Sequence, residues 1–330
     1  MSALMTRSRG LLASPYFTSL VTVLLLLVLL GMGGAAYPGF LSLQVLFNLL
    51  IDNAFLLVIA VGMSFVILSG GIDLSVGSVL ALSTMVAATL LHRWHLHPLL
   101  VIAIVLALGA AFGAGMGALI HCFRLQPFIV TLAGMFLARG LCYLISINSI
   151  TIEDPLFVMM SRSQLHFLGG FVSPGVVIAM LTLAAAIYIA HFTPFGRAVY
   201  AIGGNETSAQ MMGLPVARAK VLIYAGSGFC AALAGLLFSF YMLSGYGLHA
   251  QGTELDAIAA VVIGGTLLTG GYGYLAGALS GVLVLGTIQT LIAFDGSLSS
   301  WWTRIVIGGL LFVFCVVQRL MSIGAGKGRK

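Results

Sequence analysis

The sequence predicts an all-α protein whose helices cross a membrane about ten times. Three observations predict this fold class: 61% of the 330 residues are hydrophobic, only 7% are charged, and the mean hydropathy is +1.16. A soluble domain usually carries about 25% charged residues. Because this much apolar surface could not remain in water, the composition excludes a soluble enzyme, a nucleic-acid-binding protein and an extracellular module.

Ten apolar runs account for the predicted spans. Each span needs about 20 apolar residues, so ten spans leave about 130 residues for loops and ends, which is too few for a sizeable soluble domain. We therefore expect residues 1–330 to form a single transmembrane domain. The runs cover residues 16–36, 53–69, 74–91, 98–120, 127–147, 174–192, 218–244, 257–270, 273–294 and 300–319.

Two of these runs depart from a simple span. The run at 16–36 follows two arginines, as in a signal peptide, but it exceeds the apolar core of about 7–15 residues that such peptides have. We expect it to be an uncleaved first helix. The run at 257–270 is short for a hydrocarbon layer of about 30 Å, which favours a broken helix that ends inside the protein.

The basic residues predict the orientation of the chain. When both termini are placed in the cytoplasm, with tails at 1–15 and 320–330, only Arg93 and Arg162 lie clearly outside. The positive-inside rule favours this topology. The net charge of +6 is then explained by topology and does not indicate an anionic partner such as a nucleic acid. The basic residues that fall inside are Arg7, Arg9, Arg124, Arg197, Arg218, Lys220, Arg319, Lys327, Arg329 and Lys330.

A short motif occurs once in each half of the sequence. The letters LSGG at 68–71, with Gly77, return as LTGG at 268–271, with Gly277. Such matches favour a duplicated transporter fold with its path at the interface of the halves, although chance is an alternative in a chain with 42 glycines. The candidate path residues from this repeat are Gly70, Gly71, Gly270 and Gly271. Glycines at four-residue spacing (109, 113, 117 and 273, 277, 281) predict close helix packing.

Polar residues inside or beside the spans are functional candidates because they are expensive in lipid. Asp73 follows the first glycine pair and has two possible roles: capping the next helix with help from Ser75, or lining the path. Asn53 belongs to a polar cluster at the start of the second span and is a further path candidate. Arg139 lies within the fifth span. Arg304 lies near the outer end of the tenth, where a side chain that simply extends to the interface is the favoured alternative to a functional role.

No catalytic or metal-binding set is found in the sequence. The four cysteines have no ligand or redox spacing, and His92, His95 and His97 fit neither one helical face nor a zinc-finger pattern. The segment ending at Lys327 is no P-loop, since it lacks the preceding strand and the Ser or Thr that holds Mg²⁺. We predict no cofactor and no ATPase site, so any ATP-driven step would need another chain.

The loop at 193–217 carries the best functional signal. Asn205 can cap a short helix with Glu206 in its first turn, and Gly213 with the following proline would end that helix. Exposed methionines at 211–212, with Arg197 at the edge, would fit a groove on a partner protein. The alternative is an ordinary loop resting on lipid headgroups.

These motifs together resemble a known family. Residues 62–78 (GMSFVILSGGIDLSVGS), 203–206 (GGNE) and 262–266 (VIGGT) resemble the inner-membrane permeases of ribose-type sugar ABC importers, and the similarity runs through nearly all ten spans. Among these, the chain looks most like a galactofuranose transporter permease. That similarity rests on residues 52–55 (DNAF), 254–259 (ELDAIA) and 294–303 (FDGSLSSWWT).

The resemblance implies a type II-like ABC importer permease in the bacterial inner membrane. Two permease subunits would enclose the path: this chain and a paralogue, with a second copy of this chain as the alternative. A periplasmic sugar-binding protein would deliver the sugar, and two cytoplasmic ABC ATPase subunits would dock on the inner face. Arg197, Gly203, Asn205, Glu206 and Gly213 match the coupling loop of the family.

Two other classes of function were weighed against this one. A solitary ion-coupled carrier of a small polar solute would need charged residues near the midplane, where the sequence offers only Arg139 and Asp73. An intramembrane enzyme would need a nucleophile with its base or two facing carboxylates, and neither is found. The carrier is therefore the alternative to the importer subunit.

Overall fold

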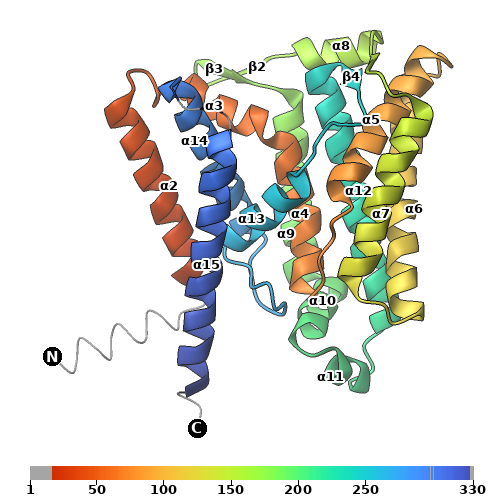
Figure 1. Cartoon of the computed structure of the whole chain (residues 1–330), viewed down its shortest axis with the longest axis vertical. Helices are drawn as coiled ribbons and strands as arrows, with labels where there is room; N and C mark the ends of the chain where they lie inside the picture. The colour runs from red at the N-terminus through yellow and green to blue at the C-terminus, as the bar shows by residue number, and fades with distance from the viewer. Residues whose placement is uncertain (1–16, 298, 300, 328–330) are drawn as a thin grey trace.

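The computed structural model describes residues 17–297, 299 and 301–327, and helices dominate them (Figure 1). The predicted tail at 1–15 and residues 328–330 lie outside the described residues. The helices are α2 (Phe17–Ala36), α3 (Leu43–Asp52), α4 (Ala54–Leu68), α5 (Val76–His92), α6 (Pro98–Cys122), α7 (Pro127–Ile145), α8 (Pro155–Arg162), α9 (Pro174–Phe192), α10 (Pro194–Gly204), α11 (Glu206–Met211), α12 (Val216–Met242), α13 (Thr253–Ile263), α14 (Ala276–Asp295) and α15 (Trp301–Lys327).

Each apolar run of the sequence contains a helix, which confirms an all-α membrane fold. Five described helices are long and apolar enough to cross a membrane, namely α6, α7, α9, α12 and α14. The pair α3 and α4 passes the same test together with a bend of 54°, and shorter apolar stretches lie in α2, α5 and α15. The tenth predicted span belongs to α15, which continues as a helix to Lys327.

The run at 257–270 forms a half-helix, as its shortness predicted. Helix α13 ends at Ile263, and residues 264–275 return to α14 without forming a regular helix. Helix α13 begins at Thr253, before the apolar run. The run starts later because Glu254 and Asp256, in the first turn of the helix, are charged and are not part of a hydropathy pattern. Both carboxylates lie at the positive end of the helix dipole.

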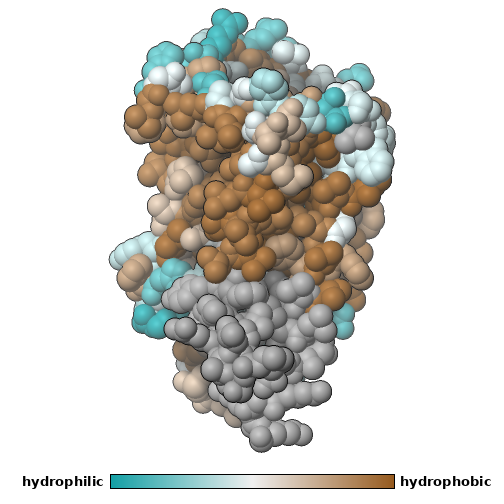
Figure 2. All heavy atoms as spheres, turned by 90° about the vertical axis from the view of Figure 1, so that its left-hand side faces the viewer, coloured by the Kyte–Doolittle hydropathy of each residue, from teal (hydrophilic) through white to brown (hydrophobic). Residues whose placement is uncertain are grey.

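The two ends of the molecule differ. At one end lie α10, α11 and the end of α15, and we call it the α10 end; at the other lie α8 and two small sheets, and we call it the α8 end (Figure 1). In these sheets, β1 (Ile150–Thr151) pairs antiparallel with β4 (Ser244–Gly245), and β2 (Leu165–Phe167) with β3 (Gly170–Val172). The face formed around α2 is apolar over its middle and hydrophilic at the α8 end (Figure 2). This banding suits a bilayer.

Helix α12 lies at the centre and packs against α4, α5 and α6. The predicted glycine stripe on α6 makes this packing possible: a Cβ on Gly109 or Gly113 would come within 3.0 Å of backbone oxygens of α12. Gly277 and Gly281 of α14 meet the backbone of α13 in the same way. The close-packing interpretation is confirmed for these positions.

Two non-helical segments, 69–75 and 243–252, turn back into the molecule and lead into α5 and α13. The first returns from the α10 end and the second from the α8 end, so both helices begin within the body of the fold (Figure 1). Their first turns meet, because a Cβ on Gly77 would lie within 3.0 Å of the Glu254 carboxylate and of the Ala250 carbonyl oxygen.

Candidate functional site

The segment 193–217 folds as two short helices at the α10 end. Thr193 caps α10, its hydroxyl accepting from the Gly196 amide at 3.2 Å, and Asn205 caps α11, its Oδ1 accepting from the Ser208 amide at 2.8 Å. The predicted cap at Asn205 is therefore confirmed. Gly213 follows α11 with a φ of +78°, a backbone conformation that suits glycine at a helix end.

One face of these helices is buried and the other is open. Ala198, Ile202 and Ala209 pack with the start of α12, which fixes α10 and α11 to the body of the protein. Met211 and Met212 are 83% and 68% exposed. The open face also carries Arg197 and Glu206. The residues that we expected to meet a partner are thus presented to the outside.

Glu206 is held by an ion pair. Its carboxylate lies 2.6 Å from the Nζ of Lys220, on the first turns of α12. Since the Glu206 side chain is about half exposed, the pair fixes the position of α11 more than it stabilises the fold.

The two glycine turns of the repeat meet each other beside α10. We call this contact the glycine junction; it comprises Gly70, Gly203, Gly204, Gly270 and Gly271. The Gly271 amide donates to the Leu68 carbonyl oxygen at 2.8 Å, which joins the two turns directly. A Cβ on Gly270 would lie 2.7 Å from the Gly70 nitrogen. The motif that recurs in the sequence therefore recurs as two turns in contact.

The end of α10 closes the glycine junction. A Cβ on Gly203 would come within 3.0 Å of both the Leu68 carbonyl oxygen and the Gly271 nitrogen, so α10 touches both turns through its backbone. The next residue, Gly204, has open space where a Cβ would be. Backbone packed on backbone leaves no flexible side chain to absorb a displacement, so a movement of α10 must move the turns.

A tyrosine adds a second link between α10 and the second turn. The Tyr200 hydroxyl donates to the Gly273 carbonyl oxygen at 2.9 Å. Burial, with a smaller contribution from Tyr274, raises the pKa of Tyr200 to about 12, so this phenol stays a neutral donor at physiological pH.

A groove opens beside the glycine junction at the α10 end, with a volume of about 530 Å³. It lies between the first turn of the repeat, the loop that joins α6 to α7, and α11 with the start of α12. Its polar lining includes His121, Arg124, Glu206 and Lys220. Gly70 and Gly71 line the same groove, so a partner seated there would contact α11 and the first turn together.

Asp73 holds the turn that leads into α5, whose N-cap residue is Ser75. The Asp73 side chain is fully buried, and Oδ1 accepts from the Ser75 amide at 2.9 Å and from the Ser75 hydroxyl at 2.6 Å. Oδ2 accepts from the Ser227 hydroxyl of α12 at 2.7 Å. These contacts match a structural role: Asp73 bonds the N-cap residue Ser75 and ties the segment before α5 to α12, although it does not itself cap the first turn of α5.

The remaining candidate, Asn53, lies at the other end of α4. It forms the junction of α3 and α4, and its amide donates to the Leu49 carbonyl oxygen at 2.9 Å. A Cβ on Gly286 would come 2.5 Å from this amide, so α14 packs closely against the bend. The structure thus brings Gly70, Gly270 and Gly271 together with Gly203, whereas Gly71 packs against Tyr224, and it places Asn53 and Asp73 elsewhere.

Two arginines in the spans have partners that the sequence did not reveal. Arg139 donates to the Gly247 and His249 carbonyl oxygens, at 2.5 and 2.9 Å, and so holds the non-helical segment before α13. Arg304 donates to Asp256 at 3.4 Å and to the Gln251 carbonyl oxygen at 3.1 Å. In the described part of the chain, no group of His, Cys, Asp and Glu residues could hold a metal ion.

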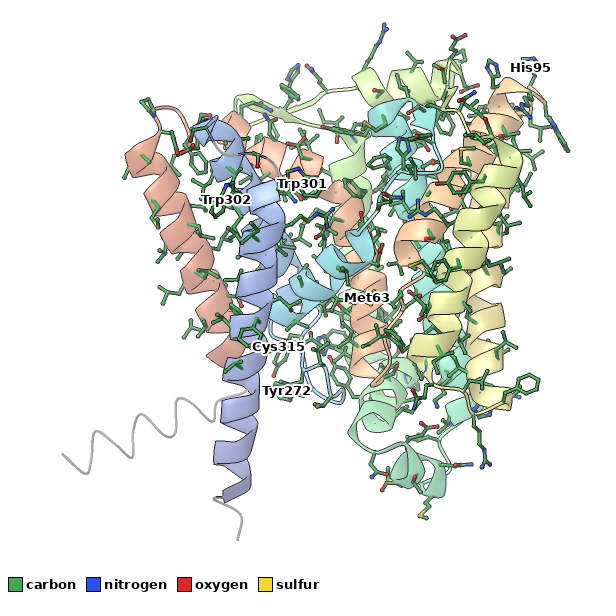
Figure 3. The ribbon with its side chains drawn as sticks, in the orientation of Figure 1. Met63, His95, Tyr272, Trp301, Trp302 and Cys315 are labelled. Carbon is green, nitrogen blue, oxygen red and sulfur yellow. The ribbon has the colours of Figure 1, made fainter. Side chains whose placement is uncertain are left out.

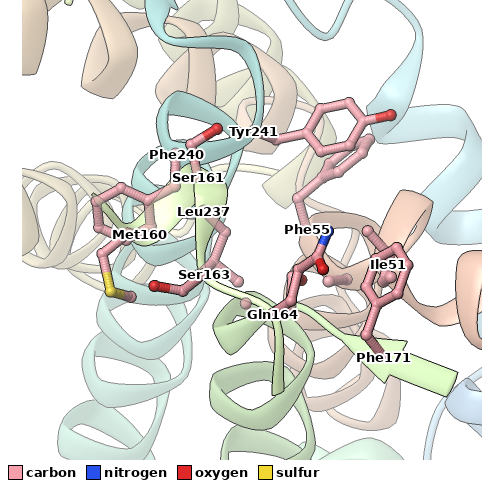
Figure 4. A pocket seen from close by; sticks show the side chains of 13 residues that line it. Ile51, Phe55, Met160, Ser161, Ser163, Gln164, Phe171, Leu237, Phe240 and Tyr241 are labelled. Carbon is pink, nitrogen blue, oxygen red and sulfur yellow. The ribbon is translucent and has the colours of Figure 1, made fainter. Parts of the chain in front are cut away.

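A smaller pocket of about 210 Å³ lies at the α8 end, between α3, α4, α8 and α12 (Figure 4). Phe55, Phe240 and Tyr241 form aromatic walls, and Ser161 and Gln164 add polar groups. The Tyr241 hydroxyl donates to Asp52 at 3.1 Å, which fixes the ring at the edge of this pocket.

Comparison with known proteins places this geometry in a family context. Residues 45–315 match the family described as branched-chain amino acid transport system / permease component. The chain is 51% identical, over 87% of each sequence, to the inner membrane ABC transporter permease protein YjfF of Escherichia coli K12. It is 39% identical to the fructose import permease protein FruG of Bifidobacterium longum, over 94% of this chain and 93% of FruG. It is also 39% identical to the ribose import permease protein RbsC of E. coli K12, over 86% and 88%. No solved structure matches the chain.

Proposed function

The chain belongs to the family of branched-chain amino acid transport system permease components, and we propose that it translocates a monosaccharide into the cytoplasm as the permease subunit of an ABC importer. Relatives named as ribose and fructose import permeases support a sugar as the cargo. The chain is a transport subunit without an ATPase site of its own, like the ABC permeases to which it is similar.

The finer identity of the sugar is a proposal as well. The sequence favours a galactofuranose-type sugar, with a ribose-type sugar as the next choice. YjfF, at 51% identity, is named only as an ABC transporter permease, so its name does not choose between them. No observation favours a solitary ion-coupled carrier, because Asp73 is fully engaged by serines and Arg139 by backbone carbonyls.

The glycine junction is the observation that carries the proposal. When the two ATPase subunits close on ATP, they must move membrane-spanning helices of the permease with which they have no direct contact. Helix α10 contacts both repeat turns through the backbone of Gly203 and the second turn also through the Tyr200 hydroxyl. The α10–α11 surface presents Arg197, Glu206 and two methionines to a partner. In this proposal the ATPase grips α11, and α10 passes the displacement into both halves of the fold.

The proposal also sets the partners and the orientation. The ABC ATPase subunits would dock at the α10 end, which faces the cytoplasm together with both termini, and the periplasmic sugar-binding protein would dock at the α8 end. Basic residues at the α10 end, including Arg124, Arg197 and Lys220, support this direction. A second permease subunit, a paralogue in preference to a second copy, would complete the path.

The test is co-purification from membranes in mild detergent, followed by mass identification of the bound chains and an ATPase assay with candidate binding proteins. We expect an ATPase and a second permease to be recovered. Glu206→Ala and Arg197→Ala should insert normally yet lose uptake and ATPase stimulation. Recovery of this chain alone, with uptake into ATP-free vesicles, would establish the carrier instead. Normal coupling in both variants would show that the α10–α11 assignment is wrong.

A further inference from the structure

A polar cleft of about 480 Å³ lies between the first turn of α13, the last turns of α14 and the first turns of α15. We call it the α13–α15 cleft. Its polar groups are Asp256, Gln289, Thr303 and Arg304, and Ile292 and Ile307 form its apolar part. None of these residues belongs to the glycine junction or to the α10–α11 surface.

The depth of the cleft indicates that water reaches it. Trp301 and Trp302 are 76% and 47% exposed on the first turn of α15, below the top of α14 (Figure 3), where such residues mark a membrane boundary. Arg304 lies one turn further along α15, toward the α10 end, and its side chain is 49% exposed. At this level the long side chain of Arg304 reaches the aqueous boundary, so its guanidinium faces water.

The backbone beside the cleft gives independent support. Arg304 donates to the Gln251 carbonyl oxygen, in the non-helical segment that precedes α13. Gly252, next in the chain, has a φ of +82° and lies against the guanidinium. Non-helical backbone at membrane depth persists only where protein buries it or where it lines a water-filled cavity. Because Gln251 is exposed and the Arg304 guanidinium is half-exposed, we infer that the cleft is filled with water.

The chemistry of the lining selects the class of solute. Asp256 and Arg304 form an ion pair at 3.4 Å, so the lining has no net charge and favours a neutral solute over an ion. Carboxylate, guanidinium, amide and hydroxyl groups on one side offer both acceptors and donors, as vicinal hydroxyls require. The isoleucines on the other side suit the C–H face of a sugar ring. We propose that the α13–α15 cleft is a binding station for a neutral sugar on the path.

The proposal rests on the proposed function, and a labelling experiment separates the two. A reporter cysteine replaces Ala293, which lines the cleft and is not one of its polar groups. Cys122 and Cys315 are replaced by serine, whereas buried Cys142 and Cys230 stay. The reporter is modified with a charged, membrane-impermeant methanethiosulfonate in spheroplasts that carry the full importer. A matched control places a cysteine at Leu181, which is 64% exposed on apolar α9.

We expect the cysteine at 293 to react at least about tenfold faster than the cysteine at 181, because only the first is in water. D-Ribose, L-arabinose or D-fructose at about 50 mM should slow that reaction several-fold, while glycine at the same concentration should not. Gln289→Leu in the reporter chain should weaken the protection, whereas Thr290→Val should not. Thr290 is the neighbour of Gln289 and bonds its own helix at the Gly286 carbonyl oxygen.

Each outcome decides one point. No reaction at 293 would overturn the placement of the cleft in water. Reaction without protection by any sugar would overturn the binding station, while ATP-driven uptake of the same sugars by the unsubstituted importer would leave the proposed function standing. If the unsubstituted importer takes up none of these sugars with ATP, the proposed function itself is wrong, whatever the labelling shows.

Discussion

The glycine junction and the α13–α15 cleft are built in opposite ways. At the junction three chain segments meet through backbone atoms, with no room for a single added carbon at Gly203 or Gly270. In the cleft, long side chains such as Arg304 and Gln289 surround about 480 Å³ of space. Each construction suits one task, since close backbone packing transmits a displacement and an open polar lining can adapt to a passing solute.

The difference separates two kinds of change. A substitution at the junction has to move whole turns, because backbone atoms cannot rotate away. A substitution in the cleft changes only a hydrogen bond or a volume beside open space. Changes of similar chemical size should therefore have effects of very different magnitude in the two regions. Gly203→Ala and Thr303→Val test this at the largest and smallest expected effect, and Asp73→Ala, at a buried carboxylate outside both regions, lies between them.

Gly203→Ala should remove nearly all ATP-driven uptake. The added methyl would lie within 3.0 Å of the Leu68 carbonyl oxygen and of the Gly271 nitrogen, so α10 has to separate from at least one turn. Overpacking of this kind typically costs about 1–3 kcal/mol, which is enough to change the position of a short helix. The measurement is sugar uptake and ATPase stimulation in proteoliposomes that contain the whole importer.

Gly204→Ala is the matched control, since the neighbouring glycine has open space at its Cβ. It changes helix propensity and side-chain size by the same amount and should keep most of the uptake. Equal activity of the two alanine variants would mean that α10 does not act through the junction.

Asp73→Ala should lower the thermal stability more than any change in the cleft. It leaves the Ser75 amide and the Ser227 hydroxyl without their acceptor, at about 1–3 kcal/mol for each buried group. Ser227→Ala removes one of these bonds and should have a smaller effect in the same direction. Unfolding in detergent, followed by heating, compares the variants.

The outcome also decides between the two roles that the sequence left open for Asp73. If Asp73 serves only the fold, the Asp73→Ala variant loses stability and activity together, and its activity falls in proportion to the protein that remains folded. If Asp73→Ala unfolds at the same temperature as the unsubstituted protein yet carries no sugar, Asp73 belongs to the path.

Local features of this fold were predictable from the sequence. Apolar runs predict helices because the hydropathy of a segment depends only on its own residues. The cap at Asn205 likewise follows from the residues next to it in the sequence. The bend of 54° at Asn53 was not predicted, because the predicted span begins at 53 and α3, on the other side of the polar residues, was not expected. The start of α13 was missed for the same reason, since Glu254 and Asp256 interrupt the apolar pattern inside a helix.

The parts of the site that depend on distant segments could not be predicted. The repeat of Gly70–Gly71 at Gly270–Gly271 indicated two equivalent turns, but nothing in the sequence places Gly203 between them. Arg139 was recognised as costly in a span, while its partners Gly247 and His249 lie more than a hundred residues away. Contacts of this range depend on how the helices pack, which hydropathy and spacing do not specify.

Thr303→Val should have the smallest effect of the three. Valine keeps the shape of threonine and replaces the hydroxyl in the cleft with a methyl group. The loss of one neutral hydrogen bond is worth about 0.5–1.5 kcal/mol, so the sugar concentration that half-protects a cysteine at 293 should rise about twofold to tenfold. The thermal stability should not change, because Thr303 borders open space. Gly203→Ala also introduces one methyl group, so a difference in uptake between the two variants reflects the surroundings of that methyl group. A complete loss of uptake in Thr303→Val would mean that the cleft is as rigid as the junction, and the division between a transmitting region and an adapting one would fail.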